Sequence, residues 1–240
     1  MADLARDILS CGAAELGVPL DDRQLDQFDT FTALLLKWNR KFNVTRITDP
    51  REIAVKHYLD SLSVLSAVEM RSDASVIDVG TGAGLPGIAL KIALPGLRTV
   101  LLDSVKKKLV FVETAIGELG MSDVELVHAR AEDAGRDESY REQFGFALSR
   151  AVAKLAVLAE LCVPFCRVGG RFVAYKGPEV NGELSEARNA VRILGGHLER
   201  TVALALPHAD ARRTLVVIRK ERHTSSRYPR RAGVPQKRPL

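Results

Sequence analysis

A glycine-rich turn directly after a β-branched apolar run constrains the fold more than any other feature of this chain. The stretch VIDVGTGAGLPGIAL spans residues 76–90 and contains Gly80, Gly82, Gly84 and Gly87. Glycine has no β-carbon, so it adopts positive φ readily and lets the backbone approach a ligand closely. A strand, this turn and a helix with unpaired N-terminal N–H groups together predict a site for a nucleotide-like ligand.

The spacing of the glycines fits two classes of ligand. The GxGxxG pattern of dinucleotide-binding folds begins at Gly82. The DxGxGxG pattern of S-adenosylmethionine (SAM) methyltransferases begins at Asp78 and takes Gly80 as its first glycine. The glycines by themselves leave the choice between these ligands open.

Carboxylates outside the turn favour SAM. Asp103 ends the run TVLLD about twenty residues after the turn, where a carboxylate can bind the ribose hydroxyls that NAD and SAM share. Asp78 would repel the pyrophosphate of NAD but not the cationic methionine moiety of SAM. Glu132, in HARAED, suits an adenine amino group and follows Ala131, whose N–H is a further candidate contact. An NAD-dependent oxidoreductase is the alternative.

Alternation of short apolar runs with helical segments from Ser75 onward predicts a Rossmann-like α/β fold. The runs SVIDVG, LRTVLLD, VELVHA, FGFALSR and GRFVAYKG have the composition of buried strands. Such a sheet is mostly parallel, is covered on both faces and binds ligands at the carboxyl ends of its strands. GGHLERTVALAL and RRTLVVIRK are joined only by the short stretch PHADA, which predicts an antiparallel terminal hairpin in a seven-stranded sheet.

The segments on either side of this alternating pattern differ from it. Residues 1–70 are expected to be a helical extension packed on the core, with Asp49 capping a helix that starts at Pro50. An apolar stripe in this region is formed by Leu25, Phe28, Leu35, Trp38 and Phe42. We expect the SAM-binding domain to occupy residues 71–220.

Residues 221–240 are predicted to be a basic, disordered tail. From Arg219 onward, eight Lys and Arg face one Glu, about +7, so the remainder is near −2 although the whole chain carries +5. The tail has few core-forming residues. It would either bind an anionic polymer by counterion release or remain solvated without a partner.

Composition and motifs exclude several classes of protein. With 240 residues, 46% of them hydrophobic and 27% charged, the chain supports one sizeable core. It shows no secretory signal, and Lys154 and Glu160 interrupt its most apolar later stretch, so we expect a cytoplasmic protein without a membrane span. Its three cysteines and five histidines lack metal-ligand spacing, and we expect no metal and a monomer.

Eight separated motifs resemble one family, the RsmG (GidB) small-subunit ribosomal RNA methyltransferases. They are LLKWNRKFNVT, KHYLDSL, DVGTGAGLPGI, LLDSVKKK, ARAED, LSRAV, YKG and RRTLVVI, in this order between about residues 20 and 220. The resemblance implies a class I SAM-dependent methyltransferase fold. It also implies methylation of N7 of one guanine in 16S rRNA, with S-adenosylhomocysteine as the product.

The resemblance also implies roles for individual residues. The residues expected to hold SAM are Gly80, Leu85, Ala131, Glu132 and Arg150, with Asp103 near the ribose and Asp78 and Gly82 in the same turn. Those expected to position RNA are Lys176, Arg213, Arg130 and His57. Arg212 stands where the family commonly has an acidic residue, which leaves the register at Arg213 open.

Structural roles compete with these assignments. Arg150 could pair with Asp103 or Glu132, Lys176 could be a solvated lysine at a strand end, and His57 could be a hydrogen-bonded core histidine. Other functions also stay open: a methyltransferase for a small molecule or DNA, and a non-catalytic RNA-binding ribosome assembly factor.

Overall fold

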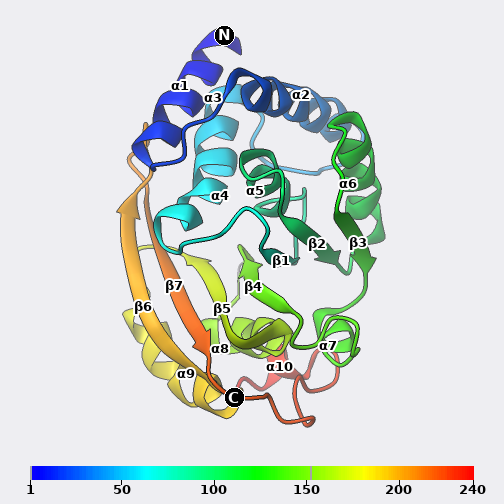
Figure 1. The fold of residues 1–240 in the computed structure, drawn as a ribbon, viewed down its shortest axis with the longest axis vertical. Coiled ribbons are helices and arrows are strands. Elements are labelled where there is room, and N and C mark those ends of the chain that lie inside the picture. Colours follow the sequence, from blue (N-terminus) through cyan, green and yellow to red (C-terminus); the bar gives the residue numbers. More distant parts are fainter. Residues whose placement is uncertain (1, 152) are drawn as a thin grey trace.

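A seven-stranded sheet lies between two layers of helices in the computed structural model, which describes residues 2–151 and 153–240 (Figure 1). The strand order is β3-β2-β1-β4-β5-β7-β6. The strands are β1 (Ser75–Val79), β2 (Arg98–Asp103), β3 (Val124–His128), β4 (Phe144–Ser149), β5 (Cys166–Lys176), β6 (Gly196–Ala205) and β7 (Arg212–Lys220). Strands β1 to β5 pair in parallel, whereas β7 is antiparallel to both β5 and β6. The predicted fold class and terminal hairpin are confirmed.

The helices divide between the two faces of the sheet. On one side lie α1 (Ala2–Glu15), α2 (Asp22–Asn39), α3 (Pro50–Ile53), the π-helix η1 (Ala54–Leu59), α4 (Asp60–Leu62), η2 (Ser63–Ser66), α5 (Gly87–Ala93) and α6 (Lys106–Glu118). On the other lie α7 (Ala131–Ala134), α8 (Leu155–Cys162), η3 (Val163–Phe165), α9 (Asn181–Ile193) and α10 (Val234–Lys237).

Side chains alternate along the strands between two cores. On β5, Val173 and Tyr175 belong to the core beneath the N-terminal helices, whereas Phe172 and Ala174 belong to the core beneath α8 and α9. Successive residues of a strand point to opposite faces, so a sheet covered on both sides needs apolar residues at nearly every position. This requirement explains the continuous apolar runs in the sequence.

Helix caps set the start of the N-terminal helices. Asp49 accepts the backbone N–H of Arg51 and of Glu52 at 2.9 and 3.1 Å, so the predicted cap is confirmed. Before α2, Asp21 and Gln24 form a reciprocal capping box with bonds of 2.8 and 2.9 Å. Both caps satisfy N–H groups that have no partner within the helix.

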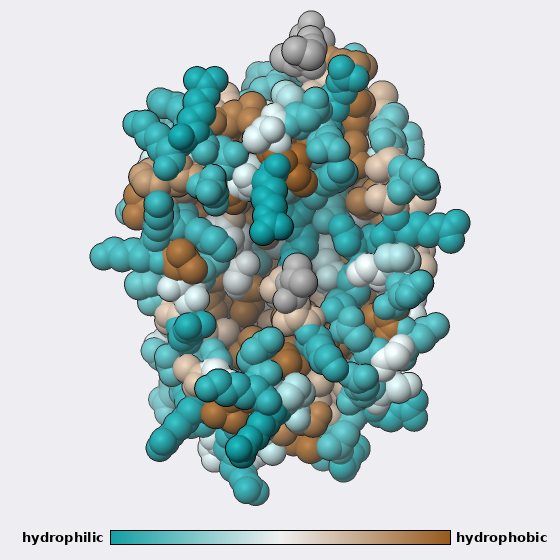
Figure 2. Space-filling view, turned by 180° about the vertical axis from the view of Figure 1, so that it is seen from behind, coloured by the Kyte–Doolittle hydropathy of each residue, from teal (hydrophilic) through white to brown (hydrophobic). Residues whose placement is uncertain are grey.

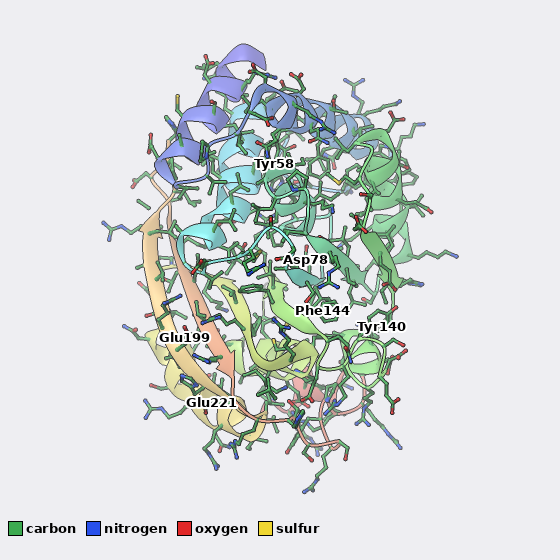
Figure 3. All side chains as sticks on the ribbon, viewed as in Figure 1. Tyr58, Asp78, Tyr140, Phe144, Glu199 and Glu221 are labelled. Atoms are coloured by element: carbon green, nitrogen blue, oxygen red, sulfur yellow. The ribbon has the colours of Figure 1, made fainter. Side chains whose placement is uncertain are left out.

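An aromatic cluster joins the N-terminal helices to the rest of the core. Phe28 and Phe31 of α2 lie 4.7 and 5.8 Å from Tyr58, centroid to centroid. Phe31 also stacks on Phe111 of α6 at 6.1 Å. Figure 3 shows Tyr58 within the helical layer above the sheet. The first seventy residues therefore share one hydrophobic core with the sheet.

The segment 221–240 differs from its sequence-based prediction. Instead of being disordered, it leaves β7, runs past α7 and returns along α8 through α10 (Figure 1). Arg230 in this segment binds the buried carboxylate of Glu160 on α8. The composition of the segment reveals its positive charge. It does not reveal the carboxylate and carbonyl oxygens elsewhere in the chain that bind the segment.

The surface is largely polar. Figure 2 shows hydrophilic side chains over most of one face, with apolar residues scattered among them. Within residues 2–151 and 153–240, no helix is sufficiently long and apolar to span a bilayer.

We predict that Phe31→Ala destabilises the whole protein by about 3–5 kcal/mol, because it leaves a cavity among fully buried aromatic rings. Leu4→Ala, at an exposed position of α1, should change stability by less than about 0.5 kcal/mol. Urea unfolding followed by circular dichroism measures both. A separate early transition of the N-terminal helices in Phe31→Ala, with the main transition unchanged, would contradict a shared core.

Candidate functional site

A cavity of about 540 Å³ opens at the carboxyl ends of the parallel strands. Gly80 after β1, Asp103 at the end of β2 and Ser149 at the end of β4 line it. Arg130, Ala131 and Glu132 line it after β3, and α8 closes the opposite side. Ligands of open α/β sheets bind at this edge, so the cavity is the candidate ligand site.

The glycine turn is fixed to the neighbouring strand by its backbone. The N–H groups of Gly80 and Thr81 donate to the carbonyl oxygen of Leu102 at 2.8 and 3.0 Å. The N–H of Gly82 donates to Asp103 Oδ2 at 2.9 Å. Gly80 has φ +76°, and a β-carbon there would be 3.9 Å from its nearest neighbour, Ala151, on the cavity side. A side chain at position 80 would therefore be strained and would enter the cavity.

Asp78 lies beneath the turn and holds it from inside. Its Oδ2 accepts the hydroxyl of Thr81 at 2.7 Å and the N–H of Gly87 at 2.9 Å. A β-carbon on Gly87 would lie 2.2 Å from Leu101 Cδ2 and 3.1 Å from Asp78 Oδ2. Figure 3 shows Asp78 in the interior of the protein. The sequence predicted a carboxylate beside the methionine moiety of SAM; the structure shows a buried carboxylate that organises the turn.

Burial changes the ionisation of Asp78. The side chain is fully buried, and the loss of water raises the pKa of its carboxyl group to about 6. The hydrogen bonds from Thr81 and Gly87 oppose this shift but do not cancel it. Oδ1 is buried without a hydrogen-bond partner among the described residues, which leaves part of the cost of burying the ionised form uncompensated.

Two further predicted cofactor residues, Asp103 and Glu132, line the cavity as carboxylates. Asp103 is mostly buried and accepts N–H groups of Gly82 and Val105, at 2.9 and 2.8 Å, one on each oxygen. Each carboxylate oxygen retains a second lone pair that a hydroxyl group can use. Glu132, at the start of α7, accepts the N–H of Gly233 at 2.8 Å.

Besides Asp78, three of the expected SAM residues are not among those that line the cavity in this structure. Leu85 is buried in the core near α5. Gly82 faces Asp103 across the turn. Arg150 donates to Asp60 Oδ2 at 3.1 Å and to the carbonyl oxygen of Lys56 at 3.0 Å, so its carboxylate partner is Asp60 and not either acid proposed from the sequence.

Asp60 brings together two arginines that are far apart in the sequence. Arg213 on β7 donates from Nε and Nη2 to the two oxygens of Asp60 at 2.6 and 2.9 Å. Arg150 binds the same carboxylate from the end of β4. Asp60 is only 2% exposed. Sequence reasoning missed its role, although it stands three residues after His57 in the quoted KHYLDSL motif.

His57 and Lys176 are also held by protein partners. His57 Nε2 lies 2.8 Å from Thr45 Oγ1, and burial together with the positive charge of Arg150 lowers its pKa to about 4. The imidazole is therefore neutral at pH 7. Lys176 Nζ lies 2.7 Å from Glu183 Oε2 and 2.8 Å from the carbonyl oxygen of Ala153. Of the four residues predicted to position RNA, Arg130 is the exposed one at the cavity.

The fold and the position of the cavity define a class I methyltransferase-like protein. TrmN of Thermus thermophilus superposes with a TM-score of 0.54 at 18% identity, over 67% of this chain and 48% of TrmN. The structure of TYW2 from M. jannaschii in complex with AdoMet gives a TM-score of 0.50 at 13% identity, over 63% of this chain and 70% of TYW2. At these identities the likeness concerns the fold.

The chain belongs to the GidB family, described as rRNA small subunit methyltransferase G, whose model matches residues 24–215. A relative named ribosomal RNA small subunit methyltransferase G, from Pelotomaculum thermopropionicum, is 51% identical over 95% of this chain and 96% of its own. A relative of the same name from Thermoanaerobacter pseudethanolicus is 43% identical over all of both chains. The family recognised in the sequence motifs is confirmed. It supports methyl transfer and not an NAD-dependent oxidoreductase.

We predict that Asp78 makes stability depend on pH between about 4 and 6. Its folded pKa is raised, so the folded protein binds more protons than the unfolded chain in this window. The contribution of Asp78 to the free energy of unfolding is therefore largest at low pH and is lost as the pH rises through about 6. Urea unfolding gives the free energy of unfolding of the wild type and of Asp78→Asn. The value for the wild type minus that for Asp78→Asn should fall from pH 4 to pH 6.5. A difference that stays constant across the window would contradict the raised pKa.

We predict that Asp60→Asn destabilises the protein by about 3–5 kcal/mol, because it leaves two arginines beside a buried site without their carboxylate. The matched control is Glu186→Gln, which removes an exposed pair with Lys154 and should cost less than about 1 kcal/mol. Denaturant midpoints at pH 7 compare the two. Equal, small effects would show that the Asp60 cluster adds little to stability.

Proposed function

We propose that this protein transfers the methyl group of SAM to N7 of one guanine in 16S rRNA. The observation that carries the proposal is the cavity between the Gly80 turn and the carboxylates of Asp103 and Glu132, in a chain of the rRNA small subunit methyltransferase G family. We place this activity in the cytoplasm and take the small ribosomal subunit, or an rRNA precursor of it, as the partner.

The residues of the cavity fit SAM. Asp103 would accept the ribose hydroxyls while its other lone pairs keep the turn in place. Gly80 leaves room for the cofactor because its position bears no side chain. Ala131 begins α7, where the first N–H groups lack partners within the helix, and Glu132 would face the adenine. Leu85, Gly82 and Asp78 would act by shaping the turn.

The chemistry needs alignment more than acid–base catalysis. When bound, SAM supplies a methyl group made electrophilic by its sulfonium centre. Guanine N7 would accept this methyl group with its in-plane lone pair, and the electrons of the broken carbon–sulfur bond would stay on sulfur in S-adenosylhomocysteine. N7 carries no proton, so no residue has to act as a general base. The protein contributes by fixing the positions of the two reactants.

Cations near the cavity would hold the RNA. Arg130 is exposed at the cavity and would bind a phosphate or the O6 edge of the guanine. Lys176 and Arg213 are oriented by Glu183 and Asp60, so they would present fixed rather than mobile donors. His57 is neutral, so it would contribute a hydrogen bond and not a charge, either to Thr45 or to the RNA. Because A-form RNA hides N7 in a deep groove, the target guanine should lie in a loop or be locally exposed.

Substitutions should separate cofactor binding from RNA binding. Asp103→Ala should weaken S-adenosylhomocysteine binding at least tenfold, because a charge-assisted hydrogen bond to the ribose is worth about 1.5–3 kcal/mol. Arg130→Ala should leave that affinity unchanged and lower methylation of small subunits. Isothermal titration and transfer of tritiated methyl groups measure the two effects. Equal loss of cofactor affinity in both variants would refute this division of roles.

The target base is tested in cells. Mass spectrometry of 16S rRNA nucleosides should show loss of one N7-methylguanosine when the gene is deleted and its return on complementation. An unchanged level of this nucleoside would refute the proposed reaction. RNA binding without any methyl transfer would favour the assembly factor considered above.

A further inference from the structure

Part of the wall of the cavity comes from the basic C-terminal segment, residues 221–240. Gly233, Pro235, Gln236 and Lys237 line the same cavity as Gly80 and the residues that follow β2 and β3. The last three belong to α10, which packs on α8. The segment lies beside α7 and α8 in Figure 1, and the residues that follow β2 and β3 stand more than seventy residues earlier in the chain. Residues expected to form a free tail therefore help to enclose the candidate cofactor.

A buried ion pair anchors this segment. Glu160 on α8 is fully buried, and both of its oxygens accept hydrogen bonds from Arg230. The backbone N–H of Arg230 also donates to Glu160 Oε1 at 2.8 Å. A buried carboxylate without its partner is strongly unfavourable. The folded protein thus has a specific energetic reason to keep residue 230 against α8.

Arg141 and Glu142 hold the start of the segment. The guanidinium of Arg141 donates to the carbonyl oxygens of Thr224 and Tyr228 at 2.6 and 2.8 Å. Glu142 accepts the N–H of Thr224 at 2.7 Å and pairs with the buried Lys220 at 3.0 Å. These bonds lead the chain from the end of β7 toward α7, so the segment approaches the cavity along a defined path.

The segment makes direct contact with a residue of the proposed SAM site. The N–H of Gly233 donates to Glu132 Oε1 at 2.8 Å. Pro229 packs on the other end of α7, where a β-carbon on Gly135 would lie 3.1 Å from Pro229 Cγ. Both contacts fall on the side of the cavity formed by the residues after β3, which is the side assigned to the adenosine half of SAM.

We propose that residues 229–237 are part of the SAM site, forming a wall of its adenosine half, and that docking of this segment and binding of SAM stabilise each other. The inference rests on the proposed function. A segment that encloses the ligand only when docked must bind more tightly when the ligand is present, because the coupling free energy between two binding events is reciprocal. The segment is therefore a cofactor-binding element and not a free RNA-binding tail.

Two variants detach the wall in different ways. Arg230→Ala removes the anchor outside the cavity, and a chain that ends at residue 232 keeps this anchor but lacks Gly233 and α10. Arg227→Ala is the matched control, since Arg227 is an exposed cation of the same segment. Isothermal titration with S-adenosylhomocysteine and with 5′-methylthioadenosine, which keeps the adenosine half and lacks the amino acid, measures affinity. Circular dichroism establishes which variants are folded.

We expect at least tenfold weaker binding of both ligands to the two test variants and wild-type affinity in Arg227→Ala. Unchanged affinity for both ligands in the folded test variants would overturn the inference. It would do so even if these variants methylated RNA less at saturating SAM. Loss for S-adenosylhomocysteine alone would overturn the assignment to the adenosine half. If the wild type itself bound neither ligand nor SAM, the proposed function would fail first.

Limited proteolysis of the wild type tests the coupling even if the variants do not fold. Trypsin cleaves after the Lys and Arg residues in which this segment is rich. Saturating S-adenosylhomocysteine should slow cleavage within residues 227–238 at least fivefold relative to cleavage elsewhere. A rate of cleavage in this segment that is independent of the ligand would contradict mutual stabilisation.

Discussion

The buried carboxylate of Asp60 joins the parts of the chain that must stay in register for the site to exist. Asp60 belongs to the N-terminal helices, Arg150 follows β4, and Arg213 lies on β7 in the terminal hairpin. A second link between the same layers is the hydroxyl of Tyr175, which donates to the carbonyl oxygen of Ser61 at 2.8 Å. Because the carboxylate of Asp60 is shielded from water, the geometry of its bonds to the two arginines is far more restrictive than that of a surface ion pair.

This arrangement changes what the cations around the site offer to RNA. A carboxylate is paired with each of three cations: Asp60 with Arg150 and Arg213, and Glu183 with Lys176. The charge of these cations is therefore partly neutralised, and their side chains are ordered before any ligand arrives. Ordered donors lose less conformational entropy on binding than free ones. In the proposed function, the exposed Arg130 would attract phosphate over a longer range. The site thus combines fixed positioning groups with a less restrained charge at its edge.

Local sequence signals predicted the fold and the turn, whereas long-range pairings were out of reach. The glycine turn and Asp103 follow strands that the apolar runs define, so the carboxyl edge of the sheet places them correctly. The partner of Arg150 is 90 residues away in sequence, and no local pattern encodes that contact. Likewise, residues 221–240 have few core-forming residues, and this composition indicates disorder. It does not reveal that Glu160, Glu132 and Arg141 supply partners for the segment.

The participation of residues 233–237 in the cavity sets an order of events during synthesis. The residues of the other walls extend as far as Cys162, which is synthesised about 75 residues before Lys237. At typical elongation rates this separation takes on the order of 4–15 s. In that interval β5, β6 and β7 are added to the sheet, and the wall formed by residues 233–237 follows them. If these residues hold the methyl donor as proposed, the cofactor site would be completed only after the last strand, and a translating chain would not yet retain the donor as the released protein would.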